Sequence, residues 1–465
     1  MQLGDVYRWL GERSTVTMAG RGETVLAGIN TDSRNLRLGE LFVAIAGDAF
    51  DGHAFVLDVQ KSAGAVLIDR YIPGLKVPSL RVTNTRDALA DIALGYRQQF
   101  MLPLIGVTGS NGKTTVKEMI SSILAAYVGP EARLATSGNL NNDIGVPLTL
   151  FKLSTHHKIG VIEMGMNHPG EIAQLARMAK PQVVVVTNAQ REHQEFMTSV
   201  EATAHENGSA ISALEADGVA VFPFDDACAG IWRQLAGARR CFKFGLLDSA
   251  PAASNCDVVF ASNASQARSF TLNWQPLDGE LKQVAITLNI DGTHSVRNAL
   301  AAASCALALA IPIETIAAGL AQFAPAKGRL VRTVLVSGAN LIDDSYNANP
   351  DSVRAAISVL AELGSPRILV LGDMGEVGEK GPEFHAEVGR FAADQGIDHV
   401  LLFGEATRAT AQAAGSCAQH FQSIDTLIEA VHNRITPQAN VLVKGSRFMK
   451  MERVVNALAQ ARYAA

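Results

Sequence analysis

The residues best suited to chemistry form a glycine-rich turn that follows an apolar run, 102–107, and precedes a helical pattern, 116–120. The turn consists of Thr108, Gly109, Ser110, Asn111, Gly112, Lys113, Thr114 and Thr115. A strand–turn–helix order leaves the first N–H groups of the helix unpaired at the turn, where the helix dipole also favours an anion. The turn therefore predicts a phosphate-binding loop.

The side chains of the turn indicate which phosphate ligand it takes. Gly109 and Gly112 let the backbone approach phosphate oxygens closely because they carry no Cβ. Lys113 supplies a positive charge for β- and γ-phosphates, and the Thr114 hydroxyl can join a Mg²⁺ shell. The Walker A spacing is not met, because Val107 stands where that pattern has a glycine. The alternative is a plain strand-to-helix turn that contains Gly-Lys-Thr.

Polar residues follow the expected strands of the central part of the chain. Glu163 ends the run 159–162, and His193 lies shortly after the β-branched run 183–186. Open α/β sheets bind ligands at the carboxyl ends of their strands. We expect Glu163 to reach the metal of a nucleotide bound at the neighbouring turn. His193 is either a metal ligand or a structural histidine.

Further candidates lie in less specific surroundings, and each has a plain structural alternative. Ser33 and Arg34 can hydrogen-bond an anionic ligand or form a surface ion pair. The Asn-rich stretch 136–145, with Asn139 and Asn142, is either a polar binding loop or a simple turn. Asn298 opens an Ala-rich helical stretch, where it caps the helix or contacts a nucleobase.

The last third of the chain alternates strands and helices, a pattern typical of a mostly parallel, Rossmann-like sheet. It has no G-x-G-x-x-G after its first strand, so no dinucleotide is assigned to it. Polar residues gather at three of its strand ends, which indicates a binding face. They are Asp344, Tyr346, Asn347, Asn349, Asp373, Lys444, Ser446 and Arg447.

Composition limits the class of protein. The 465 residues, 48% hydrophobic and 18% charged, suit a soluble globular chain of about three domains. A net charge of −5 leaves no basic surface for nucleic acid or an anionic membrane. The five scattered cysteines indicate a reducing, cytoplasmic location. The longest apolar run, 299–313, is too short to span a membrane.

We therefore expect an α/β protein of three domains. Residues 1–100 form the first, 101–314 a central domain with a P-loop mononucleotide-binding parallel sheet, and 315–465 a C-terminal domain with a Rossmann-like sheet.

The turn 108–115 resembles that of the Mur ligase superfamily, which also includes folylpolyglutamate synthetases and departs from Walker A in the same way. Other motifs resemble the branch that joins D-alanyl-D-alanine to UDP-N-acetylmuramoyl-tripeptide. They are Thr31–Arg34 with Gly52-His53, Gly138–Gly145, Glu163–Gly165, Lys327–Arg329, Asp343–Pro350, Leu371–Met374 and Lys444–Arg447. The resemblance implies an ATP- and Mg²⁺-dependent amide ligase of cytoplasmic peptidoglycan precursor synthesis. We expect it to act as a monomer.

The resemblance also implies roles for the candidate residues. Ser33 and Arg34 would hold the UDP end of the precursor, and the turn 108–115 would bind ATP. Thr114, Glu163 and His193 would be metal ligands, and Asn298 would contact adenine. Arg329, Asp344, Tyr346 and Asn347 would close over the nucleotide, with Lys444 and Arg447 near the carboxylate of D-alanyl-D-alanine.

One departure from the family concerns a carbamylated lysine that often bridges its metals. This chain has no lysine between Lys180 and Lys243, and the position falls near Asn207. We expect either that Glu206 supplies the missing negative charge or that a second metal is held more weakly.

Two other functions would also use a nucleotide-binding turn. Another amide ligase of the superfamily, such as one that adds glutamate to folate, is disfavoured by the motifs 343–350 and 444–447. A P-loop switch or transport ATPase would be expected to couple hydrolysis to a partner or a nucleic acid, which the mild negative charge disfavours.

Overall fold

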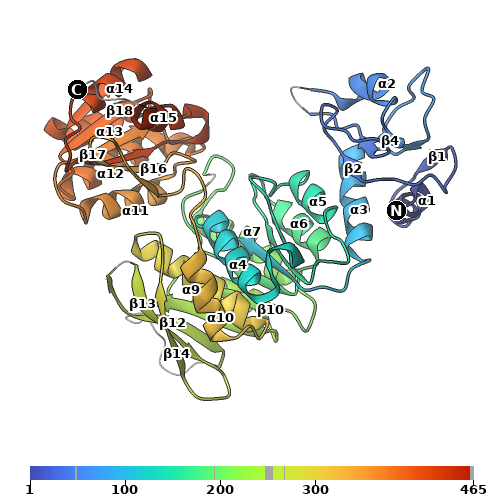
Figure 1. The fold of residues 1–465 in the computed structure, drawn as a ribbon, viewed down its shortest axis with the longest axis horizontal. Coiled ribbons are helices and arrows are strands. Elements are labelled where there is room, and N and C mark those ends of the chain that lie inside the picture. Colours follow the sequence, from blue (N-terminus) through green and yellow to red (C-terminus); the bar gives the residue numbers. More distant parts are fainter. Residues whose placement is uncertain (48–49, 193, 247–254, 267, 461–465) are drawn as a thin grey trace.

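A large central sheet carries the glycine-rich turn. One smaller domain precedes the central domain in the chain and another follows it (Figure 1). The computed structural model describes residues 1–47, 50–192, 194–246, 255–266 and 268–460. Across these residues the strands form three sheets, of five, nine and six strands. The α/β class with a central mononucleotide-binding sheet and a C-terminal Rossmann-like sheet is thereby confirmed.

The N-terminal sheet has the order β1-β5-β4-β3-β2, with β1 antiparallel and the others parallel. Its strands are β1 (Thr17–Ala19), β2 (Ile29–Asn30), β3 (Leu41–Val43), β4 (Ala65–Ile68) and β5 (Ser79–Arg81). Helices α1 (Leu3–Gly11) and α3 (Thr85–Arg97) pack on one face and α2 (Val56–Val59) on the other. Within the apolar run 41–46, only residues 41–43 pair as a strand.

Helix α3 joins this domain to the central one. The guanidinium of Arg97 is buried and donates to the carbonyls of Ala179, Phe100 and Leu102. Burial lowers the pKa of Arg97, but each of its three guanidinium nitrogens donates to a carbonyl. The Tyr96 hydroxyl adds a bond to the Leu153 carbonyl at 2.8 Å. The end of α3 is therefore held by the central domain.

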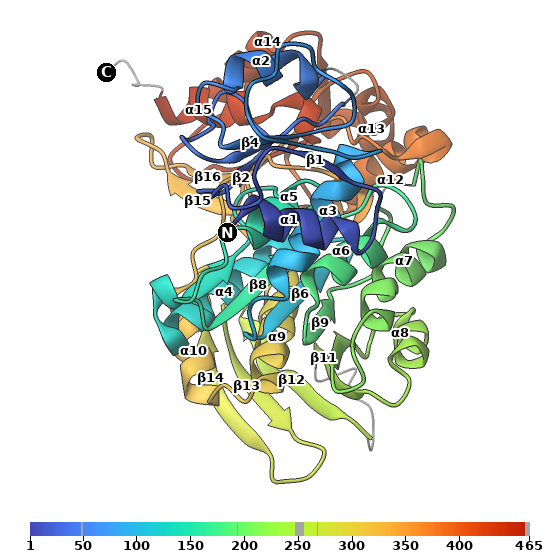
Figure 2. The same cartoon turned by 90° about the vertical axis from the view of Figure 1, so that its right-hand side faces the viewer.

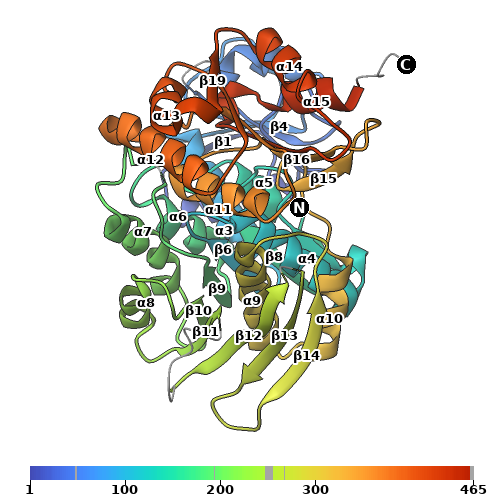
Figure 3. The same cartoon turned by 90° about the vertical axis from the view of Figure 1, so that its left-hand side faces the viewer.

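The central sheet has the order β14-β13-β12-β11-β10-β9-β6-β8-β7. Strands β6 to β12 are parallel to one another. Strands β13 and β14 extend the sheet in antiparallel pairing. The bounds are β6 (Leu104–Thr108), β7 (Arg133–Ala135), β8 (Ile159–Glu163), β9 (Val183–Val186), β10 (Val219–Pro223), β11 (Arg240–Leu246), β12 (Asp257–Gln266), β13 (Ser269–Gln275) and β14 (Lys282–Thr287). Figures 2 and 3 show β12–β14 projecting away from the two smaller domains.

Helices cover both faces of the central sheet, which explains its unbroken runs of β-branched residues. Along β9, Val183 and Val185 pack into one core cluster and Val184 and Val186 into the other. The first face carries α4 (Lys113–Val128), α9 (Thr293–Ala308) and α10 (Ile313–Gln322). The second carries α5 (Gly145–Leu150), α6 (Glu171–Ala179), α7 (Val200–Ser212) and α8 (Ala229–Ala236). Most of α10 lies beyond the expected start of the third domain but packs in the central core.

The C-terminal sheet has the order β15-β16-β20-β17-β18-β19, parallel except for β15. Its strands are β15 (Val331–Val334), β16 (Asn340–Asp344), β17 (Arg367–Gly372), β18 (His399–Phe403), β19 (Ala418–Phe421) and β20 (Asn440–Lys444). Helices α11 (Pro350–Ala361), α12 (Gly381–Asp394) and α13 (Thr407–Ala414) cover one face; α14 (Ile424–His432) and α15 (Glu452–Gln460) cover the other.

In the described part of the chain, short 3-10 helices occur at Gly52–Phe55, Pro130–Ala132, Gly378–Lys380, Gly415–Cys417 and Arg447–Met449. Among the described residues, no helix is both long and apolar enough to cross a bilayer.

Candidate active site

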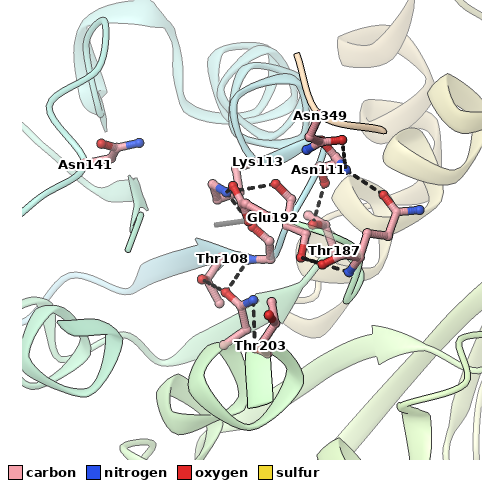
Figure 4. Close-up of polar contacts among 12 residues, drawn as sticks. Thr108, Asn111, Lys113, Asn141, Thr187, Glu192, Thr203 and Asn349 are labelled. Carbon is pink, nitrogen blue, oxygen red and sulfur yellow. Dashed lines mark hydrogen bonds and ion pairs between the residues drawn. The ribbon is translucent and has the colours of Figure 1, made fainter. Parts of the chain in front are cut away.

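The glycine-rich turn connects the end of β6 to the start of α4, as the sequence predicts. Gly112 caps α4 with φ +86°, a conformation that favours glycine. The Lys113 ammonium bends back over the turn and donates to the carbonyls of Gly109 (2.6 Å) and Ser110 (2.9 Å). It also pairs with the Glu192 carboxylate at 2.7 Å (Figure 4). The cation is thus held at the mouth of the turn.

The first half of the turn is fixed by Asn207, a buried residue of α7. Its Oδ1 accepts from the Thr108 hydroxyl (2.6 Å) and the Gly109 N–H (2.9 Å), and its Nδ2 donates to the Thr203 carbonyl (3.1 Å). Gly109 has φ +126°, and a Cβ there would lie 2.1 Å from Thr187 Oγ1. Thr108 and Gly109 therefore serve as the anchored base of the loop.

The apex of the turn is held by two residues that follow β9. The Asn111 N–H donates to Asn188 Oδ1 (2.9 Å), and its carbonyl accepts from Thr187 Oγ1 (2.7 Å) and Asn188 Nδ2 (3.0 Å). With the base and apex fixed, the N–H groups at the start of α4, including those of Thr114 and Thr115, are the ones left to face an anion. This part of the turn meets the requirement for phosphate.

Glu163 lies beside the turn at the end of β8, where it is almost completely buried. Its Oε1 accepts from Thr114 Oγ1 (3.1 Å) and Asn141 Nδ2 (2.9 Å). Its Oε2 is buried and has no hydrogen-bond partner among the described residues. An unpartnered buried carboxylate oxygen next to a threonine hydroxyl fits Mg²⁺, which takes oxygen ligands and is commonly bound by one or two carboxylates together with substrate phosphates.

His193 lies outside the described residues, and within those residues no cluster of three or more His, Cys, Asp or Glu side chains could hold a metal. The expectation that Glu206 supplies a negative charge at the metal is wrong. Its carboxylate accepts from the N–H groups of Gly170 (2.8 Å) and Ile172 (2.9 Å), so it caps the start of α6 instead.

The strand ends of the C-terminal sheet face the turn across a shared pocket of about 1160 Å³. The Lys444 ammonium, almost completely buried, donates to Asp344 Oδ2 (2.6 Å) and the Asn347 carbonyl (2.8 Å). The guanidiniums of Arg329 and Arg447 lie 4.3 Å and 6.0 Å from the centre of the Tyr346 ring. Arg447 is largely exposed and also pairs with Glu452 at 3.0 Å.

The pocket collects most of the residues predicted from sequence. Its lining includes Ser110, Asn111, Gly112, Lys113, Thr114, Thr115, Asn139, Asn142, Glu163, Asn298, Arg329, Asp344, Tyr346, Asn347, Lys444 and Arg447. Asn142 Oδ1 also accepts from the N–H of Gly145 at 2.8 Å, so it holds the start of α5. Asn298 packs against the turn, because a Cβ on Gly112 would lie 2.5 Å from its Oδ1.

Ser33 and Arg34 lie in the N-terminal domain and do not line this pocket. The Arg34 guanidinium bonds both oxygens of Asp32 at 2.9 Å and is mostly exposed. These hydrogen bonds lower the pKa of Asp32 to about 2. The surface ion pair considered as the alternative is therefore present.

Ion pairs that no local pattern predicts connect the central and C-terminal domains. Arg191 donates to Asp351 Oδ1 (2.6 Å) and Glu387 Oε2 (2.6 Å), and Arg354 donates to Glu387 Oε1 (2.6 Å). The Arg191 guanidinium also lies 5.1 Å from the centre of the Phe384 ring. Hydrogen bonds from Arg191, followed by those from Arg354, hold the pKa of Glu387 at about 2, against an ordinary value of 4.5.

This shift predicts an acid-sensitive domain contact. A carboxylate with a depressed pKa stabilises the fold fully above pH 4.5, and that stabilisation is lost as the pH falls towards 2. We expect the urea midpoint of unfolding to fall less between pH 5 and pH 3 in Glu387→Gln than in the wild type. The exposed pair Glu405–Arg408 provides the control, since Glu405→Gln should leave the wild-type pH dependence unchanged. Equal falls in the wild type and Glu387→Gln would contradict the assignment.

Comparisons with known proteins agree with this architecture. The Mur ligase middle domain matches residues 107–306, and the Mur ligase glutamate ligase domain matches residues 328–447. The UDP-N-acetylmuramoyl-tripeptide–D-alanyl-D-alanine ligase of Escherichia coli K12 is 38% identical over 94% of each chain. The ligase of the same name from Bacillus subtilis 168 is 33% identical, also over 94% of each chain.

Solved structures give the same answer. A crystal structure of MurF from Acinetobacter baumannii has a TM-score of 0.89 and 31% identity, covering 99% of this chain and 98% of that one. MurF from Thermotoga maritima in complex with ADP has a TM-score of 0.79 and 25% identity, covering 93% and 97%. The chain belongs to the Mur ligase family, in the branch of the UDP-N-acetylmuramoyl-tripeptide–D-alanyl-D-alanine ligases.

Proposed function

We propose that this chain uses ATP to join D-alanyl-D-alanine to UDP-N-acetylmuramoyl-tripeptide through an acyl phosphate, acting as a monomer in the cytoplasm. The observation that carries the proposal is the shared pocket. It places the phosphate-binding turn of the central sheet opposite the strand ends of the C-terminal sheet. A ligase that must bring ATP, an acid and an amine together needs such a site between domains.

The first step forms a bond between a carboxylate oxygen of the tripeptide and the γ-phosphorus, and ADP leaves. The N–H groups at the start of α4 and the Lys113 ammonium hold the phosphates and offset their negative charge. Thr114 and Glu163 would hold Mg²⁺, which when bound stabilises charge on the transferring phosphoryl group. His193 stays a candidate for a second metal.

In the second step the amine nitrogen of D-alanyl-D-alanine attacks the acyl carbon, phosphate leaves and the nitrogen loses a proton. Arg329, Asp344, Tyr346 and Asn347 would contact the nucleotide from the C-terminal side, and Asn298 from α9. Arg447, whose guanidinium is exposed beside Tyr346, would meet the carboxylate of D-alanyl-D-alanine together with Lys444. Ser33 and Arg34 would hold the UDP end, and Asn139 and Asn142 polar groups of the peptide.

Release of phosphate tests the proposal. With ATP, Mg²⁺, UDP-N-acetylmuramoyl-tripeptide and D-alanyl-D-alanine, we expect one phosphate released per pentapeptide formed. Almost no phosphate should be released when either the tripeptide or D-alanyl-D-alanine is omitted. Precursors with lysine or diaminopimelate in third position should be compared in parallel. Equal phosphate release without D-alanyl-D-alanine, or ligation of glutamate to folate, would contradict the proposal.

A further inference from the structure

The apex of the phosphate-binding turn contacts the C-terminal domain directly through a pair of side-chain amides. Asn349 Nδ2 donates to Asn111 Oδ1 at 2.9 Å, and Asn111 Nδ2 donates to Asn349 Oδ1 at 3.3 Å. Figure 4 shows the two side chains facing each other from different domains. The two residues are 238 positions apart in the chain. A reciprocal amide pair of this kind fixes both distance and orientation.

The backbone of Asn111 is held by the central domain, and its side chain points to the C-terminal domain. Its N–H and carbonyl are taken by Asn188 and Thr187 of the central domain. Gln190 Oε1 accepts from Asn111 Nδ2 at 2.7 Å, which sets which end of the amide points in which direction. The Asn111 side chain therefore links the loop to the C-terminal domain, while the backbone contacts of Asn111 hold the shape of the loop.

Asn349 is the N-cap of α11, so the contact fixes the start of that helix. Its Oδ1 accepts from the Ser352 N–H at 2.8 Å. Two residues later, Asp351 accepts from the Arg191 N–H at 3.0 Å and from its guanidinium. The first turn of α11 is thus docked on the central domain at two points, and two points define a direction as well as a position.

The segment that leads into α11 carries the residues expected to meet the reactants. Tyr346 and Asn347 lie three and two residues before Asn349, and the Asn347 carbonyl accepts from Lys444. A shift of Asn349 would therefore move this group relative to the phosphate loop. Misplacement of reacting groups by about 1 Å can cost as much as a hundredfold in rate.

We propose that Asn349 is a positioning residue for the ligation reaction, which acts through Asn111 to set the C-terminal strand-end residues against the phosphate loop. The inference rests on the proposed ligase activity. Asn349 bonds Asn111 and the first turn of α11, and the phosphate loop keeps its own contacts to Asn207 and Asn188. We therefore expect the effect of Asn349 to fall mainly on turnover rather than on nucleotide binding.

The variant Asn349→Ser isolates this contact from helix stability. Serine caps helices about as well as asparagine, but its side chain is too short to reach Asn111. We expect kcat for ligation to fall about tenfold, as for the loss of a coupled pair. The Kd for MgADP and the melting temperature should stay close to the wild-type values. Ser423→Ala, which removes the N-cap of α14 in the same domain, should lower the melting temperature without changing kcat.

A double-mutant cycle with Asn111→Ala completes the test. If the two amides act as a unit, the double variant loses no more kcat than the more damaging single variant. The proposal is overturned if Asn349→Ser ligates at the wild-type rate, if its kcat loss comes with an equal loss of MgADP affinity, or if the two losses multiply. Failure of the wild type itself to ligate would instead reject the proposed function.

Discussion

Lys113→Met abolishes ligation while the fold stays intact, which is the largest effect we expect from a single substitution. The Lys113 ammonium lies over the turn, held by two loop carbonyls and Glu192. Methionine keeps the length and the apolar part of the side chain but removes the charge. Attack of a carboxylate on a phosphate then brings two negative groups together without this cation.

The size of the effect follows from that repulsion. Two unit charges about 4 Å apart repel by about 4 kcal/mol at an effective dielectric constant near 20. Since about 1.4 kcal/mol corresponds to a factor of ten in rate, we expect kcat to fall by about a thousandfold or more. Initial rates of phosphate release at saturating substrates measure it.

Two further variants keep this test clear. Lys152→Ala removes an exposed lysine of the same domain and should leave activity unchanged. Loss of Lys113 also deprives Glu192 of an ion pair, so the double variant with Glu192→Gln should regain any stability lost in the single variant without regaining activity. Turnover by Lys113→Met within tenfold of the wild type would refute the role of the cation.

Glu163→Gln should change the dependence of the reaction on Mg²⁺. Glutamine keeps one oxygen for the Thr114 hydroxyl and the Asn141 amide but replaces Oε2, the buried unpartnered oxygen, with an NH₂ group. A donor placed where the cation would bind repels it. We expect kcat to fall about a hundredfold, because the metal contributes several kcal/mol to charge stabilisation. The Mg²⁺ concentration for half-maximal rate should rise in parallel.

Glu206→Gln is the matched control for this prediction. Glu206 caps α6, so its replacement should lower the melting temperature while the Mg²⁺ dependence stays that of the wild type. A second readout is the stabilisation of each variant by ADP with and without Mg²⁺. An unchanged Mg²⁺ titration in Glu163→Gln would show that the metal is held elsewhere.

Helix and strand bounds show where local patterns are reliable. The run 183–186, expected to be a strand, is β9 as observed. Helices α11 (Pro350–Ala361) and α12 (Gly381–Asp394) belong to the alternation of strands and helices expected in the last third of the chain. Buried strands and amphipathic helices can be predicted from the pattern of apolar residues along a continuous segment. The antiparallel extension β13–β14 had no such clear signal, because its strands are partly exposed and their pairing depends on β12.

Glu206 and Asn207 show why the sequence alone does not tell which of two neighbouring helix residues contacts a given site. Consecutive residues of an α-helix point about 100° apart, since a turn takes 3.6 residues. Asn207 faces the phosphate loop and Glu206 faces the start of α6. Which of the two meets the loop depends on how α7 is rotated against the sheet, and only packing decides that rotation.

The sequence by itself determined the glycine-rich turn between strand and helix, the acidic residue beside it and the α/β class, because these follow from contiguous residues and from strand ends along a parallel sheet. The tertiary structure alone decided what holds the turn. Asn207 and Asn349 reach it from positions 98 and 238 residues away in the chain. Such contacts arise when helices and domains pack, and their partners cannot be identified from the spacing of residues along the chain.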